Sequence, residues 1–186
     1  GGYTRLNHFS HPDPEIRLHW IEWFKKFADL TVALESKTMG SHFGILTTID
    51  NEDKEIRNNR FEENVRCWKE VAKYGATVGL ESLTWEPMSM SREYGESVAE
   101  VEKIQNRFVS ENFDIPMKLC LDVDHGEVLS NNPMDTDPYI YLENFARQTA
   151  QVHLKQSYAD KGGHWPFTNE HNLQGKIVPE RVLKSL

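Results

Sequence analysis

Short apolar segments alternate with amphipathic segments along the whole chain, and this alternation constrains the fold more than any other feature of the sequence. The apolar segments predict strands at 30–34, 77–83, 117–123 and 151–155, with the residues at 1–9 a further candidate. These segments lack a regular polar alternation, which is typical of strands covered on both faces. Helical spacing of apolar residues predicts helices at 14–28, 61–75, 98–108 and 139–148, and after Pro179.

The order of the predicted elements is that of a parallel α/β protein. A doubly wound sheet and a (β/α)8 barrel both consist of strands that alternate with helices in this way. A complete barrel typically needs about 250 residues, whereas this chain has 186 residues and ends inside a segment predicted to be helical. If the fold is a barrel, we therefore expect it to be incomplete.

The charge of the chain disfavours a protein that binds nucleic acid. Asp and Glu number 29 against 21 Lys and Arg, for a formal net charge of −8, and phosphate backbones attract the opposite sign. No apolar run approaches the roughly 20 residues of a membrane span, and the N-terminal sequence lacks the pattern of a signal or transit peptide. Cys67 and Cys120 lie within apolar segments, which indicates core positions in a reducing compartment. These features predict a cytoplasmic protein without nucleic-acid or membrane partners.

Three ionisable residues occur in the predicted strands, where a buried strand is normally apolar. Glu81, Asp122 and His153 lie in successive strand segments, and buried ionisable groups are costly unless they are paired or bind a metal. In a parallel barrel, the carboxyl ends of the strands meet at one mouth. We expect the three residues to form a mixed oxygen and nitrogen site for Mn²⁺, Mg²⁺, Co²⁺ or Zn²⁺. The alternative for each residue alone is a side chain that interacts with a loop or a helix end or, for His153, a core histidine whose hydrogen bonds are satisfied.

At these residues the sequence resembles the sugar-phosphate isomerase and epimerase family that has a xylose-isomerase-like barrel. The segments that carry the resemblance are GLESLTWEP, LCLDVDHGE, VHLKQS and HWPFTNEHNLQGKI, in that order. The resemblance covers nearly the whole chain and is greatest to the branch that acts on erythrulose phosphate in erythritol catabolism. It implies a partial (β/α)8 TIM barrel of about strands 3 to 7, with residues 1–186 forming a single domain truncated at both ends.

The resemblance also implies a set of metal ligands. Such barrels bind a divalent metal through Glu, Asp, His and Glu on the fifth to eighth strands. The first three ligands fall on Glu81, Asp122 and His153, with Asp124 the alternative to Asp122. The fourth ligand has no position in this sequence, which ends at Leu186. We expect the metal to be Mn²⁺.

Four further residues are candidates for binding substrate. The resemblance implies that His125, three residues after Asp122, binds a substrate hydroxyl, and that Glu86 contacts substrate or supports the site. Lys155 lies two residues after His153 and so shares a face of the strand with it, which favours contact with a phosphate or sugar. His164 lies in an aromatic loop that forms either a lid over a small sugar or a subunit contact in a homo-oligomer.

The chemistry that the resemblance implies is a metal-dependent epimerisation or isomerisation of a ketose or ketose phosphate. A carboxylate, Glu81 in this expectation, removes the proton next to the carbonyl to form an enediolate. The substrate is a small sugar or sugar phosphate. Two alternatives remain: a noncatalytic binding module derived from the barrel, and a metal-dependent endonuclease-like hydrolase of the same fold, which the net charge disfavours.

Overall fold

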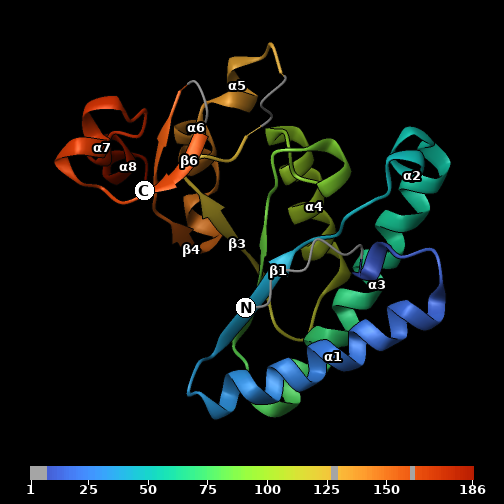
Figure 1. The fold of residues 1–186 in the computed structure, drawn as a ribbon. Helices are drawn as coiled ribbons and strands as arrows, with labels where there is room; N and C mark the ends of the chain where they lie inside the picture. Colours follow the sequence, from blue (N-terminus) through green and yellow to red (C-terminus); the bar gives the residue numbers. More distant parts are fainter. Residues whose placement is uncertain (1–7, 127–129, 160–161) are drawn as a thin grey trace.

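A four-stranded parallel sheet forms the centre of the protein (Figure 1). The structure is a computed structural model that describes residues 8–126, 130–159 and 162–186. The strands follow one another in the sheet in chain order: β1 (Thr38–His42), β2 (Ser82–Glu86), β3 (Met117–Asp122) and β4 (Thr149–His153). Most of the candidate strand at 1–9 lies outside the described residues; its last two residues belong to the 3₁₀ helix η1 (His8–Ser10).

Four helices are confirmed where apolar periodicity predicted them: α1 (Pro14–Ala33), α3 (Lys54–Val78), α4 (Val98–Glu111) and α6 (Pro138–Phe145). Each begins after a side chain that accepts a hydrogen bond from a backbone N–H of the first turn, as N-cap residues do. The helix predicted after Pro179 is also confirmed, as α8 (Pro179–Ser185). The other short helices are α2 (Thr48–Glu52), η2 (Ser91–Glu93), α5 (Pro133–Thr136), η3 (Ala146–Gln148) and α7 (Asn169–Gln174). Among the described residues, no helix is both long and apolar enough to cross a membrane.

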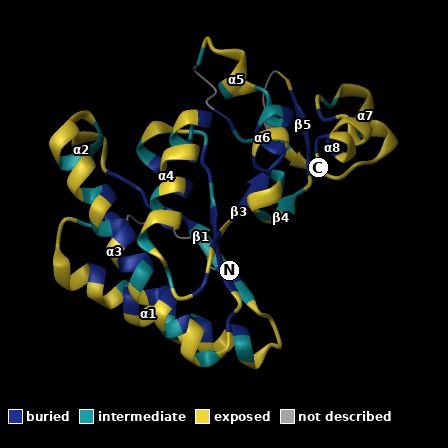
Figure 2. Ribbon diagram, turned by 180° about the vertical axis from the view of Figure 1, so that it is seen from behind, coloured by how far each residue is buried: buried dark blue, intermediate teal, exposed yellow. Residues whose placement is uncertain are grey.

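The two faces of the sheet differ. Residues such as Leu83, Trp85 and Leu119 belong to the apolar core shared with the helices, and Figure 2 shows the long helices alternating buried and exposed residues. Thr84 and Cys120 occupy the intervening positions and line a cavity on the other face. Because successive side chains of a strand point to opposite faces, the final residues of β2, β3 and β4 share the face of Thr84 and Cys120.

The predicted strand at 30–34 is wrong, because α1 continues through it to Ala33. Leu30 and Leu34 are exposed, and the Oγ1 atom of Thr31 donates a hydrogen bond to the carbonyl of Phe27, as in a helix. A short apolar run is equally consistent with a buried strand and with the last turn of a helix. The strand that follows is β1 instead, whose sequence TMGSH is polar for a buried strand.

The predicted strand at 77–83 begins too early. Helix α3 passes Gly75 and ends at Val78, because Gly79 adopts a left-handed conformation (φ 101°) and caps it. The strand β2 then covers Ser82–Glu86. The predicted strand at 117–123 is confirmed in β3, and that at 151–155 overlaps β4, which begins and ends two residues earlier.

A small hairpin follows β4. Its strands, β5 (Gln156–Tyr158) and β6 (Gly162–Trp165), are antiparallel. The side-chain amide of Gln156 anchors the hairpin to the chain ahead of α8: it donates to the carbonyl of Ile177 at 2.9 Å and accepts from the N–H of Ile177 at 2.9 Å. The hydroxyl of Ser157 in β5 donates a hydrogen bond to Asp124, just after β3, and this contact holds the hairpin beside the carboxyl end of the sheet.

Candidate active site

The carboxyl ends of three adjacent strands bring ionisable side chains together. Glu86, Asp122 and His153 are the final residues of β2, β3 and β4. The register of the sheet pairs Asp122 directly with His153. Functional sites of parallel α/β folds lie at this edge of the sheet.

Two histidines surround the Glu86 carboxylate. Its Oε1 atom lies 3.2 Å from Nδ1 of His153 and 3.3 Å from Nδ1 of His125. The Oδ2 atom of Asp122 lies 3.9 Å from Nδ1 of His153 and 3.9 Å from Nε2 of His125. His125 is held in place by a hydrogen bond of 3.0 Å between its Nδ1 atom and the carbonyl of Pro87. The result is one cluster of two carboxylates and two imidazoles.

A buried lysine extends the cluster toward the hairpin. The Nζ atom of Lys155 lies 3.2 Å from Oδ2 of Asp122 and 3.2 Å from Nε2 of His164 on β6. All six residues named in this cluster line one cavity of about 670 Å³: Glu86, Asp122, His125, His153, Lys155 and His164. The structure therefore brings together every residue that the sequence analysis proposed for the site, with one exception.

The exception is Glu81. This residue precedes β2, its side chain is 65% exposed, and it forms an ion pair with Lys37, which precedes β1. Glu81 therefore lies at the amino end of the sheet, whereas Asp122 and His153 lie at the carboxyl end. The prediction that Glu81 joins them is wrong in its placement, because β2 starts after this residue. Glu86, at the end of the strand, is the glutamate of the cluster.

The structure also separates the two aspartates that the sequence left as alternatives. Asp124 accepts a hydrogen bond of 2.6 Å from the hydroxyl of Ser157 and forms an ion pair with Lys176. These contacts attach the end of β3 to the hairpin segment. Asp122 alone of the two lies beside His125 and His153.

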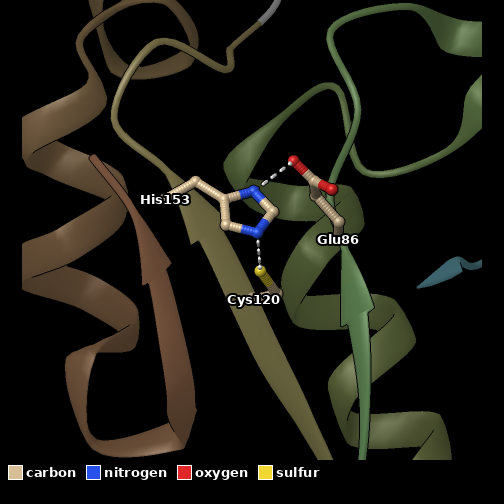
Figure 3. A group of neighbouring side chains, drawn as sticks. All are labelled: Glu86, Cys120 and His153. Atoms are coloured by element: carbon tan, nitrogen blue, oxygen red, sulfur yellow. Dashed lines mark hydrogen bonds and ion pairs between the residues drawn. The ribbon is translucent and has the colours of Figure 1, made fainter. Parts of the chain in front are cut away.

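Sequence reasoning missed Cys120, which it assigned to the core. The Sγ atom of Cys120 lies 3.3 Å from Nε2 of His153, on the side opposite Glu86 (Figure 3). Burial, followed by the negative charges of Glu86 and Asp122, raises the pKa of the Cys120 thiol to about 12. The sequence did contain a signal for Cys120. It lies two residues before Asp122, and residues two apart in a strand share a face.

The side chains at this edge fit a divalent metal. Glu86, Asp122 and His125 each offer a ligand atom within 4.8 Å of the other two, and Glu86, Cys120 and His153 do the same. A set of carboxylate oxygens and imidazole nitrogens suits Mn²⁺, Co²⁺ or Zn²⁺. The chemistry of these donors thus agrees with the site type expected from the sequence.

The fold is that of a known family. Residues 2–184 match the family described as Xylose isomerase-like TIM barrel, and the chain belongs to this family. A curated relative, D-erythrulose 1-phosphate 3-epimerase from Brucella abortus (strain 2308), is 45% identical over 185 residues. The alignment covers 100% of this chain and 60% of the relative. The chain therefore spans less than two thirds of the length of that relative. The predicted fold class and family resemblance are confirmed.

Solved structures show the same fold. A protein of Rhodospirillum rubrum ATCC 11170 assigned as a xylose isomerase is 26% identical, with a TM-score of 0.84 over 96% of this chain and 58% of its own. A D-tagatose 3-epimerase-like protein is 16% identical, with a TM-score of 0.74 over 99% of this chain and 63% of its own. D-psicose 3-epimerase from Clostridium cellulolyticum H10 is 16% identical, with a TM-score of 0.62 over 87% and 54%. The last two likenesses concern the fold alone.

Proposed function

We propose that this chain belongs to a metal-dependent 3-epimerase of a small ketose phosphate, such as erythrulose phosphate. The observation that carries the proposal is the convergence of Glu86, Asp122 and His153 at the carboxyl edge of the sheet. The name of the 45% identical relative supports the reaction type and the substrate class. Isomerisation of a ketose to an aldose also proceeds through an enediolate, but it removes a proton from C1 and gives a constitutional isomer, so the identity of the product separates the two reactions.

The proposed metal ligands are Glu86, Asp122 and His153, with Mn²⁺ the favoured ion and His125 beside it for a substrate hydroxyl. When bound, the ion supplies a positive charge that stabilises negative charge on the oxygens of the substrate. Asp122 is suited to a fixed ligand, because its side chain is 5% exposed and the backbone N–H of Asp124 donates to its Oδ1 atom at 2.9 Å. Such a hydrogen bond orients a ligand and holds it in place.

Glu86 is the proposed proton carrier. Its carboxylate lines the 670 Å³ cavity, where a ketose would present the carbon next to its carbonyl. Removal of the proton from that carbon gives an enediolate, and the two histidine rings beside Oε1 hold the carboxylate in position. A second carboxylate on the opposite face must return the proton for inversion. The family resemblance implies a glutamate of a further strand for that step.

Lys155 and His164 are the proposed contacts for the phosphate. The lysine is 9% exposed, lines the same cavity and lies within hydrogen-bond distance of His164. A buried ammonium group that has a carboxylate on one side can bind a phosphate oxygen on the other. This contact would favour a phosphorylated ketose over the free sugar.

Proton exchange tests the proposal directly. Erythrulose phosphate is incubated in D₂O with the intact protein, with and without Mn²⁺, and its proton NMR spectrum is followed. We expect metal-dependent loss of the C3 proton signal as deuterium replaces it. Inversion at C3 gives the enantiomer of the substrate, which is detected as a loss of optical rotation. Bound Mn²⁺ without any exchange would contradict the proposed substrate class, and the absence of Mn²⁺ binding would contradict the proposed metal site.

A further inference from the structure

Glu86 and His153 lie between two cavities, only one of which holds the proposed catalytic site. The cavity of about 670 Å³ contains Asp122 and His125, whereas a second cavity of about 460 Å³ contains Cys120 and Thr84. Both cavities are lined by Glu86 and His153. The two residues can therefore face a ligand on either side.

The imidazole of His153 has a different partner at each nitrogen. Its Nδ1 atom lies 3.2 Å from Oε1 of Glu86, and its Nε2 atom lies 3.3 Å from Sγ of Cys120 (Figure 3). One ligand atom each from Glu86, Cys120 and His153 lies within 4.8 Å of the other two. Oxygen, nitrogen and sulfur donors thus lie close together near Cys120, which is two residues before Asp122 in β3.

The separation between Sγ of Cys120 and Nε2 of His153 matches that between two ligands of a tetrahedral ion. A Zn–S bond of about 2.3 Å and a Zn–N bond of about 2.0 Å place the two ligand atoms roughly 3.5 Å apart at the tetrahedral angle. The Sγ atom of Cys120 and the Nε2 atom of His153 are 3.3 Å apart. Thiolate ligands select soft ions such as Zn²⁺, whereas carboxylate ligands suit Mn²⁺ and Mg²⁺.

We infer that Glu86, Cys120 and His153 form a second, inhibitory site for a thiophilic divalent ion such as Zn²⁺ or Cd²⁺. Sulfur binds the ion as thiolate, and the proton of the Cys120 thiol leaves to solvent. An ion at this site engages Glu86 and His153 and so withdraws both from the site that contains Asp122. This site for a soft metal ion, called the soft site below, is inferred from geometry alone, and only its inhibitory effect rests on the proposed function.

Cobalt reports thiolate ligation by a sulfur-to-metal charge-transfer band in the near ultraviolet. We expect titration of the intact protein with Co²⁺ alone to produce this band and Cys120→Ser to abolish it. The other cysteine, Cys67, is fully buried in α3 and lies outside both cavities, so Cys67→Ala is expected to retain the band. Thermal unfolding checks that each variant is folded, and Cys120→Ala replaces the serine variant if that protein is not.

Competition between ions tests whether an ion bound at Cys120 withdraws Glu86 and His153 from the Mn²⁺ site. We expect Cd²⁺ to displace Mn²⁺, followed by electron paramagnetic resonance, and to bind at least about tenfold more weakly to Cys120→Ser, a loss comparable to that of other metal-site changes. Affinity for Mn²⁺ should change by less than about threefold. Absence of the cobalt band, or its persistence in Cys120→Ser, would overturn the site. A cobalt band together with no proton exchange under Mn²⁺ would leave the soft site standing and refute the proposed function.

Discussion

The Oε1 atom of Glu86 lies 3.2 Å from Nδ1 of His153, although the two residues are 67 positions apart in the sequence. Each is the last residue of its strand, and β3 with Asp122 lies between them in the sheet. The contact therefore spans three strands at their carboxyl edge. It makes Glu86, rather than the other glutamate of the GLESLTWEP segment, the candidate proton carrier.

The two glutamates provide a matched pair of variants. We expect Glu86→Gln to lower the rate of proton exchange into the ketose phosphate by roughly 10²- to 10⁴-fold, because an amide cannot accept the proton. Glu81→Gln should leave the rate within about twofold, since this side chain is exposed at the opposite end of the sheet. Exchange followed by NMR in D₂O measures both. A large loss in Glu81→Gln with a normal rate in Glu86→Gln would reverse the assignment.

His153 is proposed as a metal ligand, and its removal should weaken binding of Mn²⁺. We expect His153→Ala to raise the dissociation constant for Mn²⁺ by at least about tenfold, measured by calorimetric titration. His19 on α1 is an exposed histidine far along the chain from the cluster, so His19→Ala serves as the control. Equal affinities for Mn²⁺ in the two variants would exclude His153 as a ligand.

Lys155 is proposed to discriminate phosphorylated from free ketoses. We expect Lys155→Met to raise KM for the ketose phosphate roughly ten- to hundredfold, the value of a charge-assisted hydrogen bond, with a much smaller change for the free sugar. Lys118→Met removes an exposed lysine near the start of β3 and should leave KM unchanged for both the ketose phosphate and the free sugar. An equal rise of KM for both sugars in Lys155→Met would show that the lysine acts through Asp122 instead.

The stability of the protein should fall as the pH rises through neutrality. Burial, followed by the hydrogen bond and negative charge of Glu100, raises the pKa of Glu96 to about 8 from 4.5. The folded state keeps this proton while the unfolded state loses it, so the stabilisation is complete below about pH 4.5 and is lost as the pH rises to about 8. We expect the free energy of unfolding to decrease across this window, with a slope of at most about 1.4 kcal/mol per pH unit for this one proton.

Urea unfolding at several pH values measures this slope, and Glu96→Gln is the informative variant. Its neutral amide removes the titrating group, so its stability should vary much less between pH 5 and pH 8 than that of the unaltered protein. Glu100 does not titrate in this window: burial opposes its ionisation, but its hydrogen bond with Glu96 and the charge of Arg57 lower its pKa. An unchanged slope in Glu96→Gln would assign the effect to another group.

The helices could be predicted because their signals are local. Asp13 followed by Pro14 and by apolar residues at helical spacing predicts the start of α1, and the structure confirms it. The end of this helix could not be predicted in the same way. The sequence around Leu30 and Leu34 resembles a buried strand. In the structure Leu30 lies in the last turn of α1 and Leu34 is its C-cap, and both line the cavity that also contains Thr84 and Cys120.

Part of the site was also evident in the sequence. Asp122 and His153 stand out because ionisable residues are costly in buried strands, and His125, Lys155 and Glu86 were candidates through their spacing or resemblance. Cys120 was not recognised as part of the site, because a cysteine in an apolar segment is typical of a core. Its contact with Nε2 of His153 and its position in a cavity distinguish it from Cys67.

The sequence by itself determined that strands alternate with helices, the family of the barrel and the types of side chain available for a metal. The tertiary structure alone decided which residues meet. Thr38 pairs with Ser82, and His42 pairs with Glu86, so β2 begins after Glu81 and ends at Glu86. Strand register depends on hydrogen bonds between segments that are distant in the chain. For that reason, no local pattern around either glutamate could show which of them reaches the carboxyl edge of the sheet.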